Sequence, residues 1–177
     1  DSCLPRGYQR RVNGSNDNSK GEALVENLNL YTLLFFVAFG AQGLLLVADE
    51  IFFHYRRGLP AWERWGHPLD TLTVLLPFIS LFLFPENLFL FAGLALISTL
   101  FVTKDEWVHN EECGPGEQWL HSLLFILHPV VFYLGYLAAR DSGVEFLPLV
   151  MTALVLFMIY QIFYWNVYEN RKSRARL

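Results

Sequence analysis

The stretch KDEWVHNEECGPGEQWLH, Lys104 to His121, lies between two long apolar runs and contains a concentration of acids and imidazoles. Ionisable groups that interrupt long apolar runs are unfavourable unless they have partners, so they often mark functional sites. Glu106 and His109 are three residues apart, and Glu117 and His121 are four apart. Both spacings place two side chains on one face of a helix, which is the arrangement that metal ligands need.

A second stretch, DEIFFHYRRGLPAWERWGHPLD, Asp49 to Asp70, has the same plan. It again contains an Asp-Glu pair, a His, a turn with proline and an E-x-W-x-H element before an apolar run. The correspondence pairs Asp49-Glu50 with Asp105-Glu106 and Glu63/His67 with Glu117/His121. We therefore predict an internal repeat of two helical hairpins in the same orientation, related by an axis along the membrane normal.

The composition indicates a membrane protein. The 177 residues are 54% hydrophobic, 16% aromatic and only 17% charged, which is too apolar for an ordinary soluble domain. Each apolar run is near the roughly 20 residues that cross a hydrocarbon core, and runs this long form helices in lipid. The five runs are Leu28 to about His54, about Pro68 to Phe84, Leu88 to about His109, about Glu117 to Ala139, and Phe146 to about Tyr168.

The predicted fold is therefore an all-α integral membrane protein with five transmembrane helices, of which the first four form a bundle of two repeated hairpins. Residues 28–170 form a single helical domain, between a polar, flexible N-terminal tail (1–27) and a basic C-terminal tail (171–177). We expect the chain to be processed or truncated, since it lacks an initiator Met. A net charge of −4 gives no indication of nucleic-acid binding, and no basic, aromatic-interleaved surface suggests it, so we expect no nucleic acid as a partner.

Basic residues near the predicted helix ends gather on one side of the membrane, which the positive-inside rule makes cytoplasmic. The N-terminus is then outside or lumenal. The basic residues are Arg56, Arg57, Arg64, Lys104, Arg171, Lys172, Arg174 and Arg176. All five tryptophans are expected on the same side, in an interfacial belt: Trp62, Trp65, Trp107, Trp119 and Trp165.

The bundle is predicted to hold a two-metal centre near the cytoplasmic face, since acids and imidazoles on facing helices are the ligands of such centres. The predicted ligands are Glu50, His54, His67, Asp70, Glu106, His109 and His121. Glu50 and Glu106, equivalent in the repeat, are expected to bridge the metals. Residues expected behind these ligands, some of them orienting imidazoles, are Asp49, Glu63, Asp105, Glu117, His128, Tyr160 and Tyr164. No catalytic residue is assigned.

Several of these residues have alternative interpretations. Pro68 either kinks its helix or separates His67 and Asp70 from Glu63, and Asp70 also suits a helix N-terminus. His128 is either an inner ligand or hydrogen-bonded to the carbonyl that Pro129 frees. Tyr160 and Tyr164 fit an aromatic belt as well as a role near the metals.

The single E-x-x-H element, Glu106 to His109, and the four-helix arrangement loosely resemble ferritin-like di-iron proteins such as the alternative oxidases. The first unit has E-x-x-x-H in place of a second E-x-x-H. The chain also lacks the clustered H-x-x-H-H boxes of membrane desaturases and hydroxylases. We therefore identify no family, and the metal prediction rests on ligand chemistry.

Carboxylate and imidazole ligands favour iron, with zinc or manganese as alternatives. The leading functional prediction is an oxygen-dependent di-iron oxidoreductase with a lipid-like or quinone-like substrate that enters from the bilayer, and with an electron-donor protein as partner. One alternative is a zinc-dependent membrane hydrolase. Another is a haem b-type electron carrier. A transporter is less favoured, because the ionisable groups apart from His128 do not continue across the membrane.

Overall fold

The computed structural model describes residues 30–55, 58–105 and 114–169, and these segments are almost entirely helical with no β-strand. Helix α2 (Leu30–Asp49) continues into a π-helix, η1 (Glu50–His54). Helix α4 spans Ala61–Leu83. Helix α5 (Leu88–Phe101) continues into a 3₁₀ turn, η2 (Val102–Asp105). Helix α7 spans Pro115–Ser142, and α8 (Leu147–Phe163) continues into a second π-helix, η3 (Tyr164–Glu169).

Four helices are long and apolar enough to cross a membrane, which indicates an integral membrane protein. They span Leu30–His54, Ala61–Leu83, Pro115–Ser142 and Leu147–Glu169. Their outward faces present large apolar side chains, such as Leu44 and Leu149. A soluble protein rarely exposes so extensive an apolar surface to water, whereas in a membrane such side chains contact lipid.

The third predicted span differs from the other four. Its described part is a 17-residue apolar helix, Leu88–Lys104, which is about 26 Å long at a rise of 1.5 Å per residue. This is somewhat short of a hydrocarbon core of about 30 Å. The predicted end of this span, at about His109, lies outside the described residues.

Prolines begin or interrupt the helices in ways that the sequence partly predicts. Pro115 occupies the first turn of α7, where its missing N–H leaves no hydrogen bond unmade. Pro60 immediately precedes α4, and that helix continues through Pro68 and Pro77. His67 and Asp70 are therefore inside a helix that already began before Glu63, so Pro68 does not separate them from it.

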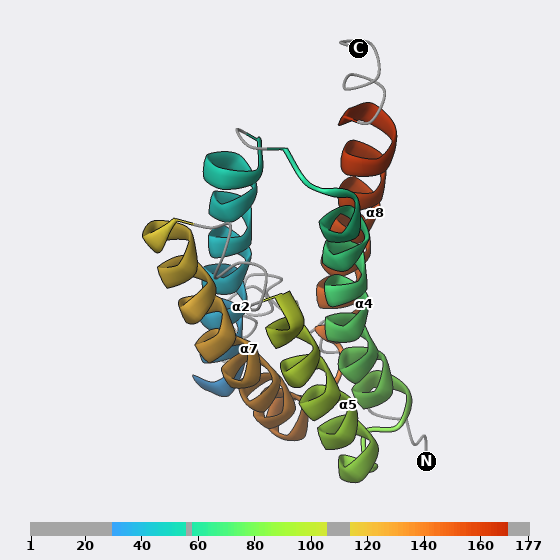
Figure 1. The fold of residues 1–177 in the computed structure, drawn as a ribbon. Helices are drawn as coiled ribbons and strands as arrows, with labels where there is room; N and C mark the ends of the chain where they lie inside the picture. Colours follow the sequence, from blue (N-terminus) through green and yellow to red (C-terminus); the bar gives the residue numbers. More distant parts are fainter. Residues whose placement is uncertain (1–29, 56–57, 106–113, 170–177) are drawn as a thin grey trace, which may run out of the picture.

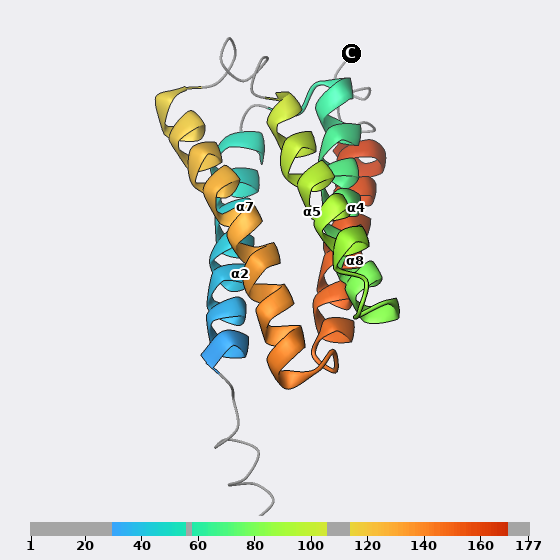
Figure 2. The ribbon, with the colours of Figure 1, turned by 90° about the horizontal axis from the view of Figure 1, so that it is seen from below.

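The helices form two groups (Figure 1, Figure 2). Helix α2 packs along α7, and α4 lies between α5 and α8. The C-terminal ends of α2, α5 and α8 and the N-terminal ends of α4 and α7 meet at one end of the bundle, here called the upper end. This is the arrangement that two consecutive hairpins predict. The internal repeat and the cytoplasmic orientation of the upper end stay predictions.

The apolar core fills the lower half of the bundle, where the two groups are closest. Phe35 of α2 and Phe78 of α4 are fully buried, with ring centroids 5.9 Å apart. Gly135 of α7 permits this approach, since a Cβ at that position would lie 2.9 Å from Phe78 Cε1. Toward the upper end α7 diverges from α4 and α8 (Figure 2). The space between the groups there contains the ionisable residues.

Candidate metal centre

Four acidic side chains of the upper end are almost fully buried: Asp49, Glu50, Glu63 and Glu117. The imidazole of His54 lies among them with no exposed surface. Carboxylates are rarely buried so completely unless they are paired or coordinate a metal. Among the described residues, the side-chain partners of Asp49 and Glu50 are imidazoles and one indole, with no lysine or arginine.

The π-helix η1 determines how His54 meets two consecutive acids. In a π-helix the hydrogen bonds join residues five apart, which brings Asp49 and His54 together as well as the Glu50–His54 pair four apart. His54 Nε2 is 3.4 Å from Asp49 Oδ2, and His54 Nδ1 is 3.9 Å from Glu50 Oε2. The ring therefore lies between the two carboxylates, with one nitrogen toward each.

The first candidate ligand group comprises Asp49, His54, Glu117 and His121, from α2, η1 and α7, and all four are buried. His121 Nε2 is 3.3 Å from Asp49 Oδ1, and His54 Nε2 is 3.7 Å from Glu117 Oε1. Ligand atoms around a tetrahedral metal with bonds of about 2.0–2.2 Å are about 3.3–3.6 Å from each other. Three pairs of ligand atoms in the group are therefore about as far apart as the ligands of one bound ion, and all four ligand atoms lie within 4.8 Å of one another.

The second candidate ligand group comprises Glu50, His54 and His67. Glu50 Oε1 is 3.9 Å from His67 Nδ1 of α4. The indole of Trp165 fixes the same carboxylate from the other side, because its Nε1–H donates to Glu50 Oε2 at 3.0 Å. The two groups share His54, whose Nε2 faces the first and whose Nδ1 faces the second.

The hydrogen bonding of His54 is incomplete within the described part of the chain. Neither ring nitrogen has a hydrogen-bond partner there, and Glu50 Oε1 has none either. A neutral imidazole carries one N–H donor and one acceptor nitrogen, and buried polar atoms almost always have partners. A metal ion at one nitrogen, with a carboxylate accepting from the other, would satisfy the ring.

The structure brings together four of the seven predicted ligands: Glu50, His54, His67 and His121. Asp49 and Glu117, both predicted behind the ligands, have oxygen atoms within the first group. Glu63, predicted in the same role, is buried in the first turn of α4.

Asp70 is not part of either group. It accepts a bond of 2.7 Å from Lys104 Nζ, which joins α4 to η2. Glu106 and His109, including the predicted bridging role of Glu106, lie outside the described residues. The same holds for the side chain of Asp105.

His128 lies deeper in the bundle and belongs to a separate polar network. Its Nδ1 is 3.2 Å from Gln42 Nε2, and its Nε2 is 3.0 Å from Ser98 Oγ. Both nitrogens thus have side-chain partners on α2 and α5, so neither interpretation from the sequence holds. Gln42 and Ser98 carried no signal in the sequence beyond being polar residues within apolar runs.

Tyr160 and Tyr164 lie near the second group without joining it. Their rings stack with a centroid separation of 5.6 Å, and Tyr160 OH is 3.2 Å from Tyr55 OH. Trp165 was predicted in the interfacial belt, and this is wrong, because it is 1% exposed. Trp62, Trp65 and Trp119 are exposed, as a belt requires, and Trp107 lies outside the described residues.

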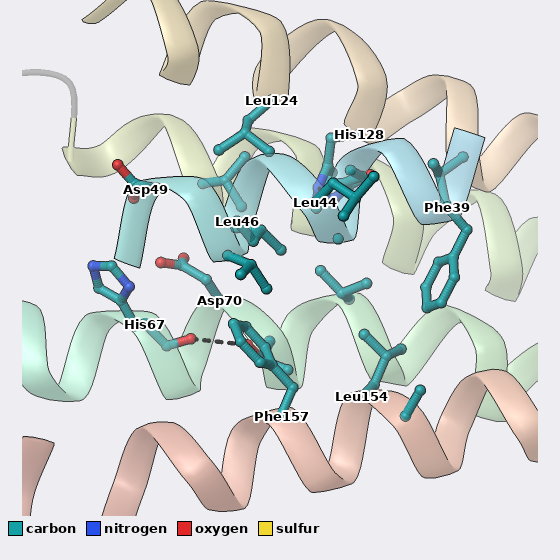
Figure 3. Close-up of a pocket in the computed structure, with 18 of the residues that line it drawn as sticks. Phe39, Leu44, Leu46, Asp49, His67, Asp70, Leu124, His128, Leu154 and Phe157 are labelled. Atoms are coloured by element: carbon teal, nitrogen blue, oxygen red, sulfur yellow. Dashed lines mark hydrogen bonds between the residues drawn. The ribbon is translucent and has the colours of Figure 1, made fainter. Parts of the chain in front are cut away.

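A cavity of about 540 Å³ lies beside the centre, between the α2–α7 group and the α4–α8 group. Figure 3 shows Asp49, His67 and Asp70 at one end of it and Phe39 at the other. His121 also lines the cavity, whereas His54, Glu50 and Glu117 do not. The candidate centre is therefore reached from the cavity through Asp49, His67 and His121.

Comparison of the chain with protein-family models, with curated proteins and with solved structures gave no match.

Proposed function

We propose that this protein is a membrane metalloenzyme whose metal is held by Asp49, His54, Glu117 and His121. The observation that carries the proposal is the fully buried imidazole of His54, which has no hydrogen-bond partner among the described residues and lies between carboxylates. A divalent cation would neutralise the acids and bind the imidazole at once.

A second metal at Glu50, His54 and His67 would complete a two-metal centre. Four buried acids and three imidazoles in this region approach the four carboxylates and two histidines of di-iron sites in helical bundles. Such a donor set suits iron. We propose that irons held by these residues would supply oxygen activation for the oxidation of an apolar substrate from the bilayer, with a separate electron-donor protein as the source of the reducing electrons.

A zinc-dependent hydrolase is the second candidate, and one observation favours it. The first group alone supplies two imidazoles and two carboxylates, which is sufficient for one metal with one carboxylate left to activate water. Glu50 would then accept a hydrogen bond from His54 Nδ1 and orient the ring, as carboxylates commonly do behind metal-bound histidines. The haem carrier is less supported, because two carboxylate atoms lie within 4.8 Å of the imidazole atoms, where a porphyrin would have to fit.

We also propose that the upper end of the bundle faces the cytoplasm. The basic residues near that end, among them Arg64 and Lys104, support this orientation. An electron-donor protein in the cytoplasm would then approach the metal centre directly. In this topology Cys3 is on the opposite side of the membrane. The accessibility of Cys3 to a thiol reagent, in a chain where it is the single cysteine, tests the orientation independently of metal binding.

The test is metal content per chain by mass spectrometry, with an optical spectrum of the same purified sample. Di-iron predicts about two irons per chain without a Soret band, the hydrolase predicts zinc alone, and the carrier predicts a Soret band. His121→Gln should lose metal, whereas His128→Gln, which removes a buried imidazole seven residues along the same helix, should retain it. If the wild-type protein neither contains nor takes up metal, the cluster is a polar network and the proposed metal site is refuted.

A further inference from the structure

We propose that the cavity binds one long hydrocarbon chain of a membrane lipid lengthwise, with the polar end of that lipid at the metal centre. The proposal rests on the proposed metalloenzyme function only for the identity of the reacting end. The binding of the chain itself follows from the length, the lining and the lateral opening of the cavity.

The cavity is long relative to its volume. It extends along α2 from Phe39 to Asp49 and along α7 from His121 to Val131. Each of these stretches spans ten residue steps, or about 15 Å at 1.5 Å per residue. A volume of about 540 Å³ falls within the range of small-molecule sites. An extended chain fits such a shape better than a compact ring system does.

Away from the metal centre, the cavity offers a ligand almost only apolar surface. Its polar side chains there bond to other parts of the protein, although the Oε1 atom of Gln42 has no partner among the described residues. Gln42 Nε2 is 3.2 Å from His128 Nδ1, and Thr71 Oγ1 donates to Gln161 Oε1 at 2.8 Å. The remaining side chains along this part are apolar, among them Phe39, Leu44, Leu46, Val74, Leu124 and Leu154. Such a lining favours methylene groups over polar ones.

Helices α2 and α8, together with the residues that immediately flank them and the π-helices that continue them, contact each other at two levels and separate between them. At the lower level, the rings of Phe35 and Phe146 have centroids 5.2 Å apart. At the upper level, Tyr55 OH is 3.2 Å from Tyr160 OH, and the Tyr55 ring lies 4.7 Å from that of Tyr164. Between these contacts α2 packs mainly on α7, and α8 packs mainly on α4.

The residues between the two contacts leave an opening. A Cβ added at Gly40 or Gly43 would meet no atom within 4 Å. Leu44 lines the cavity but is 73% exposed, and Ala153 of α8 also lines it and is exposed. This opening lies in the middle of two membrane-spanning helices. A lipid chain can therefore enter sideways without leaving the hydrocarbon region.

The polar end of the lipid is fixed by the end of the cavity that holds its acidic residues. The imidazole of His128 lines the cavity farther along, but both its nitrogens have side-chain partners, Gln42 and Ser98. Asp49 and His67 lie there, as Figure 3 shows, together with His121. A chain in the opposite orientation would bring its polar group among the apolar residues around Phe39, with loss of hydration. The carbon atoms nearest the polar end are thus the ones presented to the metal centre.

Photolabelling tests the proposal on the full chain in lipid nanodiscs. One probe is palmitic acid with a diazirine at mid-chain, and the other is a phosphatidylcholine that carries the same chain. Gly43→Trp fills the cavity from a position with free space. Gly93→Trp is the matched control, because Gly93 also meets no atom within 4 Å but lies on the exposed face of α5.

We expect saturable labelling of residues 40–47 and 153–157 in the wild type. Gly43→Trp should reduce it at least about tenfold, since the displaced methylene groups lose their burial, and Gly93→Trp should leave it unchanged. The probe that labels more efficiently identifies a free fatty acid or a phospholipid chain as the occupant. Labelling that is no stronger there than at the outer face of α5, around Leu96 and Ile97, would overturn the proposal, even if Gly43→Trp does not fold.

Metal content of the same samples separates this proposal from the proposed function. Saturable cavity labelling of a wild type that binds no metal would support the chain site and refute the metalloenzyme. Bound metal without cavity labelling would do the reverse. In His121→Gln we expect lost metal and retained labelling, because His121 lies only at the end of the cavity.

Discussion

Replacing Trp165 with phenylalanine should remove one hydrogen bond from the metal centre and leave most of its packing in place. The indole Nε1–H donates to Glu50 Oε2 at 3.0 Å, and Trp165 is 1% exposed. Phenylalanine cannot donate this bond, but it retains a ring beside Tyr164, whose centroid is 4.9 Å from that of Trp165. Glu50 then loses the group that fixes its carboxylate beside His54 and His67.

The size of the effect follows from the character of the bond. A hydrogen bond to a charged group contributes about 1.5–3 kcal/mol, and about 1.4 kcal/mol corresponds to a tenfold change in an equilibrium constant. The bond holds the Glu50 carboxylate in position either to bind a metal itself or to orient the His54 ring. Without the bond, metal affinity should fall about 10–100-fold. This range equals the effect of removing groups behind metal ligands in other proteins.

The assay is competition between the purified protein and a chromogenic chelator, which gives the dissociation constant of the metal. Trp119→Phe is the matched control, since Trp119 is 67% exposed and far less enclosed by other side chains. Thermal unfolding of both metal-free variants shows whether they fold as the wild type does. A folded Trp165→Phe protein whose metal affinity lies within a factor of two of the control would refute the role of this hydrogen bond.

Three further predictions concern the bundle and the centre. Gly135→Val should destabilise the protein by about 1–3 kcal/mol through overpacking against Phe78, as measured by denaturant unfolding, whereas Gly93→Val on the exposed face should show no comparable loss. His128→Leu should lower the unfolding temperature, because each polar partner left unpaired costs about 1–3 kcal/mol; lost metal in that variant would contradict its separation from the centre. Acidification should release metal, since protons compete with the ion for imidazole and carboxylate ligands, and a chelator titration at several pH values that showed tighter binding in acid would contradict this ligand set.

Most of the helices and the end at which the ionisable groups gather could be predicted from the sequence. Long apolar runs with short breaks determine helical spans, and two hairpins necessarily bring alternate helix ends together. His54, His67 and His121 each stand near such a break, so they were expected at the same end. Spacings of three or four residues were sufficient for this part of the prediction.

The division of roles among the acids could not be predicted, because it depends on a change of helix type. Helical periodicity of 3.6 residues pairs Glu50 with His54 and leaves Asp49 aside. The π-helix adds a residue to that turn, so Asp49 reaches the same imidazole. No residue in the segment predicts a π-helix, because such turns are stabilised by the surrounding tertiary structure.

The positions of Trp165 and Asp70 depended on contacts that sequence separation hides. Tryptophan near a helix end is usually interfacial, but Trp165 faces Glu50, 115 residues earlier. Asp70 lies on the expected helix face, but Lys104, 34 residues later, pairs with it. Statistics of single residue types do not contain such pairings, which arise only when η1, α4, η2 and η3 have packed.

The uneven packing of the bundle links the lifetime of the protein to the supply of metal. Phenylalanine rings join the helices at the lower end, whereas at the upper end α2 and α7 meet at carboxylates and imidazoles, among them Asp49 and His121 with Oδ1 and Nε2 3.3 Å apart. An ion at 1,000 times its dissociation constant would stabilise the folded state by about 4.1 kcal/mol. In metal-starved cells the upper ends would separate more often, and membrane proteases would remove the chain sooner.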